Sequence, residues 1–119
     1  MKFHKEHTWA KVDGDTALIG ISDFAQSKLT NIVFIELPSV GTEAKQGEKI
    51  ATVESVKSVS DVISPLSGGV IEVNKELEDS PELINSDPYV KGWMIKIKVK
   101  DAGELDNLMT EEEYKKSIE

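Results

Sequence analysis

The residue whose type and surroundings could do chemistry is Lys57, in the polar stretch Glu54–Asp61. A free lysine titrates near about 10.4 and is a poor nucleophile at neutral pH, and the nearby carboxylates of Glu54 and Asp61 favour its charged form. We therefore interpret Lys57 as an attachment point for a group rather than as a catalytic amine. An ordinary solvated lysine is the alternative, because the chain has 14 lysines.

The elements that must position Lys57 are two apolar, strand-like runs, Ile50–Val53 and Val62–Ile63. Paired as a hairpin, they would hold the lysine at the tip, with its amine in water. Gly47 and Gly68 flank this unit, and each is followed by a strand-like run, as expected where the chain turns sharply. The pattern predicts a compact unit of two similar halves with Lys57 at its apex.

The first third of the chain predicts a hairpin, a short helix and a buried strand. Trp9–Val12 and Thr16–Ile21 flank an Asp-Gly-Asp turn. Ser22 is suited to cap a helix of about two turns. Ile32–Leu37 is nearly all apolar and rich in β-branched residues, which predicts a buried strand.

Later segments add two helix starts and an alternating strand. Ser80–Glu82 combines a cap, a proline and an acidic residue, typical of a helix start. Trp93–Val99 alternates apolar and mostly lysine positions, which predicts a strand with one wet face. Thr110 and Glu113 form a capping box for a last helix. We predict one mainly-β domain over residues 1–119, a sandwich or flattened barrel with peripheral helices.

Composition narrows the possible functions. The chain has no cysteine, so disulfides and thiol chemistry are excluded, and His4 and His7 alone do not predict a zinc site. The net charge is −8 and every basic residue is a lysine, which disfavours nucleic-acid recognition and suits docking on basic partner surfaces. We expect no membrane span, because no long apolar run exists.

Several segments resemble the H protein of the glycine cleavage system. The lipoyl-attachment region of that family is similar to Glu54–Lys57, Ser64–Gly68 and Val70–Asn74. Four further segments are similar and follow in the family's order: His7–Trp9, Gly20–Asp23, Ile32–Pro38 and Gly92–Ile97.

The resemblance implies a fold and a function. The fold would be the hybrid barrel-sandwich of lipoyl and biotinyl domains, with a C-terminal helix added. The chain would be a monomeric carrier rather than an enzyme, with lipoic acid in amide linkage on Lys57. Its partners would be lipoate-attaching enzymes, a glycine decarboxylase, an aminomethyltransferase and dihydrolipoamide dehydrogenase. We expect it in the cytoplasm, or in the mitochondrial matrix if a transit peptide has been removed.

The resemblance also implies roles for other residues. Glu54 would help the modifying enzyme recognise the tip. In the family, a surface cleft shelters the loaded arm, and a glutamate is frequent where this chain has Thr8. Asp61 could supply the missing charge. Ser58 replaces a common alanine, and Val90 and Lys91 also depart from the family's usual residues.

Four other functions remain open from the sequence. The chain could be a lipoyl-relay protein that passes lipoyl groups to other enzymes, or an unmodified binding module. A lipoyl domain of a 2-oxo-acid dehydrogenase fits less well, because such domains are shorter and lack the block around Trp93. Biotin carriage is disfavoured, because Val56 and Ser58 stand where biotin carriers have methionines.

Overall fold

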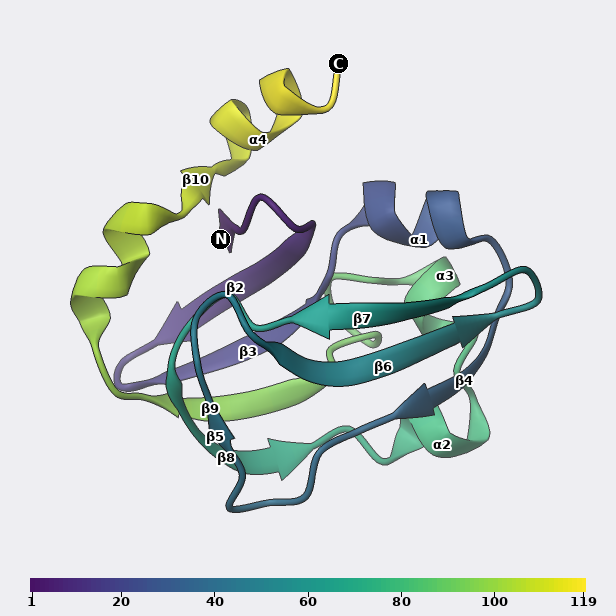
Figure 1. The fold of residues 1–119 in the computed structure, drawn as a ribbon, viewed down its shortest axis with the longest axis horizontal. Helices are drawn as coiled ribbons and strands as arrows, with labels where there is room; N and C mark the ends of the chain where they lie inside the picture. The colour runs from purple at the N-terminus through teal and green to yellow at the C-terminus, as the bar shows by residue number, and fades with distance from the viewer.

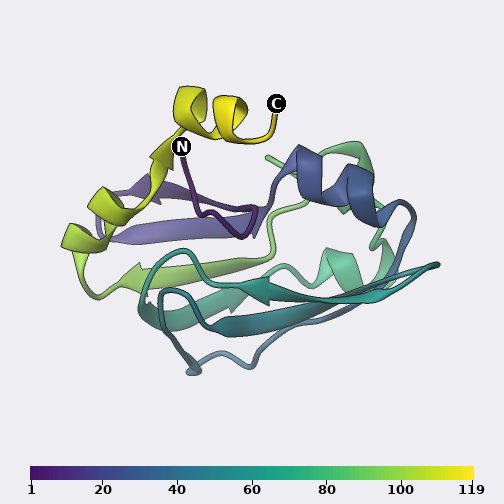
Figure 2. The same ribbon diagram turned by 45° about the horizontal axis from the view of Figure 1, so that its top comes forward.

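In the computed structural model, which describes residues 1–119, the strands form two open antiparallel sheets (Figure 1). The larger sheet has the order β10-β1-β2-β3-β9-β8-β5, and the smaller has the order β4-β6-β7. Short helices lie around the sheets, and a helix ends the chain (Figure 2), so the predicted mainly-β class with peripheral and C-terminal helices is confirmed. The helices are too short and too polar for any of them to cross a membrane.

The strands are short. Their bounds are β1 Lys2–Phe3, β2 Thr8–Asp13, β3 Thr16–Ile21, β4 Ile32–Glu36, β5 Glu43–Ala44, β6 Lys49–Ser55, β7 Val59–Ile63, β8 Gly68–Val73, β9 Ile95–Val99 and β10 Met109–Thr110. The helices are α1 Asp23–Leu29, α2 Glu76–Asp79, α3 Leu83–Ser86 and α4 Glu111–Ser117, with a 3-10 helix over Ala102–Asn107.

The predicted first hairpin forms as β2 and β3 and is fixed by Trp9. The indole is fully buried and donates hydrogen bonds to the carbonyl oxygens of Ile21, at 2.9 Å, and Pro88, at 3.1 Å. Gly20 lies opposite Trp9 in the ladder, and a Cβ there would come within 2.7 Å of the indole. Any other residue at position 20 would displace the ring. This packing fixes the place of Thr8, at the start of β2.

Two of the three predicted helix caps, those at Ser22 and Thr110, are present. Ser22 caps α1, and its Oγ accepts a hydrogen bond from the backbone N–H of Ala25 at 3.1 Å. Thr110 and Glu113 form the reciprocal capping box of α4. Because these bonds join residues three apart, the local sequence is sufficient to specify them.

Glycine is needed at positions 47 and 68, on either side of the hairpin, for two different physical reasons. Gly47 has a φ of 85°, a conformation that side chains disfavour, and space around it is open. Gly68 has no such φ, but a Cβ there would collide with the carbonyl oxygen of Lys98 at 2.0 Å. The first glycine serves a turn, and the second allows β8 to approach β9 closely.

Two predictions about elements were wrong. The strand predicted over Ile32–Leu37 forms as β4, but it is not buried throughout, because Val33 and Phe34 are exposed. Ser80 does not cap a helix; it follows α2, and α3 starts at Leu83 without a side-chain cap. The first error arises at a β-bulge between Ile32 and Phe34, which local patterning does not reveal.

Candidate functional site

Lys57 lies in the tight turn that joins β6 to β7, as predicted (Figure 1). The turn is organised by Ser55, which is buried. Its Oγ accepts hydrogen bonds from the backbone N–H groups of Lys57, at 3.2 Å, and Ser58, at 3.1 Å, while its own N–H donates to the carbonyl oxygen of Ser58 at 2.8 Å. The Lys57 side chain is exposed. The tip therefore presents this amine to solvent on a fixed backbone.

Glu54 is exposed near the end of β6. It lies opposite Phe34 on one side and opposite Val59 on the other. Side chains directly opposite each other in an antiparallel ladder share a face, so Glu54 projects from the outer face of the small sheet. The predicted exposure of this carboxylate close to Lys57 is confirmed by its position, whereas its recognition by a modifying enzyme stays a prediction.

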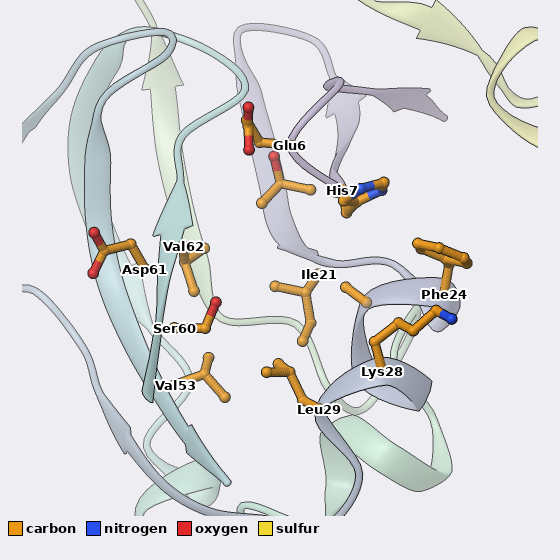
Figure 3. Close-up of a pocket in the computed structure, with 12 residues that line it drawn as sticks. Glu6, His7, Ile21, Phe24, Lys28, Leu29, Val53, Ser60, Asp61 and Val62 are labelled. Atoms are coloured by element: carbon orange, nitrogen blue, oxygen red, sulfur yellow. The ribbon is translucent and has the colours of Figure 1, made fainter. Parts of the chain in front are cut away.

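A pocket of about 290 Å³ opens between the β7 edge of the small sheet, helix α1 and the start of β2 (Figure 3). Half of its wall is apolar and half is polar, and the wall includes both Thr8 and Asp61, which are far apart in sequence. The lining residues are Glu6, His7, Thr8, Ile21, Phe24, Ala25, Lys28, Leu29, Val53, Ser60, Asp61 and Val62. A concave wall that offers both apolar contacts and polar groups can receive a small organic group that carries a polar end.

Thr8 supplies an unsatisfied polar atom to this wall. The side chain is almost fully buried, and its Oγ1 makes no hydrogen bond. Leaving a buried hydroxyl unpaired costs roughly 1–3 kcal/mol, so such atoms are rare and call for an explanation. Thr8 lines the pocket, but its Oγ1 atom is itself buried, so a ligand would reach Oγ1 only after a small movement of the surrounding side chains.

Asp61 contributes to the wall, but its carboxylate points away from the pocket (Figure 3). Ser60 and Asp61 are consecutive in β7, so their side chains lie on opposite faces of the sheet. Ser60 faces the pocket, whereas the Asp61 carboxylate lies 3.6 Å from Nζ of Lys49 on the outer face. The two charged side chains are more than half exposed, so this ion pair is weak.

The carboxylate at the pocket is that of Glu6, a residue that no pattern in the sequence indicated. Figure 3 shows its side chain at the mouth of the pocket. Its backbone N–H donates to Nδ1 of His4 at 3.1 Å, which fixes the local chain. Glu6 lies two residues before Thr8, a spacing that could have drawn attention to it. However, the chain turns at His7, with a φ of 69°, and only the tertiary structure shows where Glu6 points.

The pocket wall is connected to the C-terminal helix through His7. The Nδ1 atom of His7 lies 2.8 Å from the hydroxyl oxygen of Tyr114 in α4, and the same hydroxyl lies 2.7 Å from Oγ of Ser22. The His7 ring also packs on Phe24 at 4.9 Å. Burial raises the pKa of Tyr114 above its ordinary value, so the hydroxyl keeps its proton at neutral pH. Helix α4 thus supports one wall of the pocket.

Comparisons with known proteins point to one family over the whole length of the chain. The family model "Glycine cleavage H-protein" matches residues 1–119. A "Glycine cleavage system H protein" from Carboxydothermus hydrogenoformans is 53% identical over 119 residues, which is 100% of this chain and 92% of the relative. Another with that name, from Geobacillus thermodenitrificans, is 54% identical over 114 residues, which is 96% of this chain and 90% of the relative.

A solved structure shows the same fold. The crystal structure of a glycine cleavage system H protein from Mycobacterium marinum matches with a TM-score of 0.90 at 36% identity, over 98% of this chain and 94% of that one. This similarity supports the predicted hybrid barrel-sandwich fold, and the sequence matches span the region that contains Lys57. The chain belongs to the glycine cleavage H-protein family, the lipoyl-carrying shuttles of the glycine cleavage system.

Proposed function

We propose that Lys57 carries lipoic acid, through an amide bond between the lipoyl carboxyl group and Nζ. The observation that carries this proposal is the tip itself, where Ser55 fixes the turn and leaves the Lys57 side chain exposed. When bound, the lipoyl group supplies a disulfide that takes up an aminomethyl group and is afterwards restored from the dithiol by oxidation. The chain offers no cysteine that could compete in thiol exchange.

In this proposal the chain is a carrier and not a catalyst. The residues around Lys57 hold and present the amine, and chemistry takes place in the partner enzymes. These are a glycine decarboxylase, an aminomethyltransferase and dihydrolipoamide dehydrogenase, with a lipoate-attaching enzyme upstream. A tether on a fixed tip raises the local concentration of the reactive sulfur in each active site, so the carrier's contribution is effective concentration.

We further propose that the pocket beside β7 shelters the end of the loaded arm. Ser60 is three residues beyond Lys57, so their Cα atoms are at most roughly 11 Å apart, which is within reach of a tethered chain. Ile21, Leu29 and Val53 provide apolar contact, while Thr8 Oγ1, which is buried without a hydrogen bond, would pair with the carried amine after a small movement of the side chains around it. These side chains would exclude water from the carried group.

Glu6 is the carboxylate best placed to meet a protonated amine at this pocket. A charge-assisted bond is about twice as strong as a neutral one, although exposure at the mouth weakens it. Asp61 stays a second candidate, because its backbone lines the pocket, but its carboxylate would have to leave Lys49 and turn to the other side of β7.

The attachment proposal is tested by the intact mass of the chain after incubation with a lipoate ligase, lipoate and ATP. Wild type should gain one lipoyl group, and peptide mapping should place it on Lys57. Lys57→Arg should unfold at the same temperature, because the tip is exposed and contributes little packing, and should gain none. Lipoylation of Lys57→Arg at any position would disprove the assignment.

A further inference from the structure

Four large apolar side chains stand in solvent around Lys57. They are Val33, Phe34, Val56 and Val59, here called the tip patch. Phe34 is 53% exposed and Val59 is 64% exposed. Single exposed apolar residues are ordinary, but several gathered beside a functional residue mark an interaction surface.

The register of the small sheet explains how the patch is built. Phe34 on β4, Glu54 on β6 and Val59 on β7 lie opposite one another in turn, so they form one row across the outer face. The N–H of Val56 donates to the carbonyl oxygen of Asn31 at 3.0 Å, which ties the turn to the start of β4. The patch therefore surrounds one carboxylate, that of Glu54.

A β-bulge places two consecutive residues of β4 in the patch. The register shifts between Ile32 and Phe34, so Val33 is the extra residue on this strand. In a regular strand, neighbours alternate between faces, and one of Val33 and Phe34 would be buried. Here both are exposed. Bulges commonly re-aim side chains next to functional sites, and nothing within the chain covers these two.

We propose that the tip patch is the docking surface for the enzyme that attaches the lipoyl group to Lys57. The facing surface of that enzyme would be apolar, with a cationic group opposite Glu54. This inference rests on the proposed function of Lys57, and it adds the surface that the attaching enzyme recognises.

Reach distinguishes this enzyme from the other partners. For attachment, the Nζ atom of Lys57 must itself meet the activated carboxyl group of lipoic acid, carried as a mixed anhydride with AMP. Nζ attacks the carboxyl carbon, the C–N bond forms, the C–O bond to AMP breaks, AMP leaves with the bonding pair, and the amine releases a proton to solvent. The surface of the attaching enzyme must therefore come within the length of one lysine side chain of the hairpin. The tip patch lies at the hairpin and is the surface that the enzyme would contact. Enzymes that use the finished arm meet its far end.

The test is a steady-state assay of a lipoate ligase with lipoate and ATP, in which the concentration of the carrier is varied. Phe34→Thr and Val59→Thr keep strand propensity and remove the apolar contact. Val40→Thr, at another exposed valine away from the tip, is the matched control. Thermal unfolding of each variant shows whether the fold is intact.

We expect Phe34→Thr to raise the KM for the carrier by roughly fivefold or more, as for a well-buried interface contact, with kcat unchanged. Val59→Thr should act in the same direction, Glu54→Lys should raise KM by repelling the cationic group, and Val40→Thr should leave KM unchanged. Unchanged KM values for both folded patch variants would overturn the proposal.

Two further outcomes are separable. If the patch variants raise the KM with the glycine decarboxylase or the aminomethyltransferase but not with the ligase, the proposal that the attaching enzyme docks there is wrong. The patch would then be assigned to those other enzymes. Failure of wild type to be lipoylated on Lys57 would instead refute the proposed function, because the patch variants are compared only with a wild-type chain that is modified.

Discussion

The Oγ atom of Ser55 accepts a hydrogen bond from the backbone N–H of Lys57 at 3.2 Å, so a buried serine holds the turn that presents the exposed lysine. The same Oγ also accepts from the N–H of Ser58. Side chains of this kind often organise turns by bonding to the backbone two or three residues on. The attachment residue is thus exposed but held by a defined local network.

Ser55→Ala should loosen the tip. Oγ also donates to the carbonyl oxygen of Ser58 at 3.3 Å, and loss of its hydrogen bonds is expected to lower the free energy of unfolding by about 1 kcal/mol. Lipoylation should slow several-fold, because the ligase must then order the turn. Denaturant unfolding and the initial rate of lipoylation measure the two effects. Ser58→Ala is the control, since its Oγ makes only a 3.5 Å contact with Ser55 Oγ. Equal rates for all three chains would show that the turn network does not matter for attachment.

Thr8→Glu should make the pocket hold the carried amine more strongly. A charge-assisted hydrogen bond contributes roughly 1.5–3 kcal/mol, against roughly 0.5–1.5 kcal/mol for a bond to a neutral partner. Screening by solvent reduces this difference. The loaded protein should then release ammonia and formaldehyde more slowly when no aminomethyltransferase is present. If the rate of release stays the same, the idea that residue 8 contacts the amine fails, while attachment at Lys57 is unaffected.

Glu6→Gln should speed the same release, because it removes the carboxylate that lies at the mouth of the pocket. Asp61→Asn is the matched variant. It changes a carboxylate that faces Lys49 on the outer side, so we expect it to have the smaller effect. A larger effect of Asp61→Asn than of Glu6→Gln would show that Asp61 turns inward when the arm is loaded, as the sequence analysis envisaged.

Tyr114→Phe tests the support that α4 gives to the pocket. The change removes a hydroxyl that contacts His7 Nδ1 and Ser22 Oγ and keeps the ring, which stacks on Phe3 at 4.4 Å. The free energy of unfolding should fall by about 1–2 kcal/mol, because the buried partners lose a hydrogen bond. The melting temperature should fall by several degrees, and release from the loaded protein should become faster. A variant as stable as wild type would contradict this role of Tyr114.

Stability should decline as the pH falls through the titration range of His4. Burial lowers the pKa of His4 from its ordinary value of 6.5, against the opposing effect of Glu6, and its unprotonated Nδ1 accepts from the Glu6 N–H. The folded state therefore prefers neutral His4. The contribution of neutral His4 to the free energy of unfolding is complete above about pH 6.5. It is lost as the pH falls from there towards the lower pKa that His4 has in the folded state. His4→Gln, which can still accept that bond, should flatten the curve of unfolding free energy between about pH 7 and 5. An unchanged curve would show that His4 is not responsible.

Features that depend on near neighbours can be predicted from the amino-acid sequence alone. The caps at Ser22 and Thr110 join residues three apart, and the hairpin around Lys57 follows from two apolar runs that flank a polar turn. The alternation that precedes Val99 likewise gave β9, with Ile95 and Ile97 buried. In these cases the signal and the structure lie within one element, so local patterning was sufficient.

The packing of sheets and helices sets which residues meet. Glu6, Thr8 and Ser60 line one pocket because two sheets and α1 converge there, and no spacing along the chain encodes that convergence. It also decided that Asp61 faces outward, since the face of each β7 residue depends on the register with β6. Phe34 is exposed because a bulge shifts β4 against β6, a change in cross-strand pairing that an apolar run in the sequence cannot show.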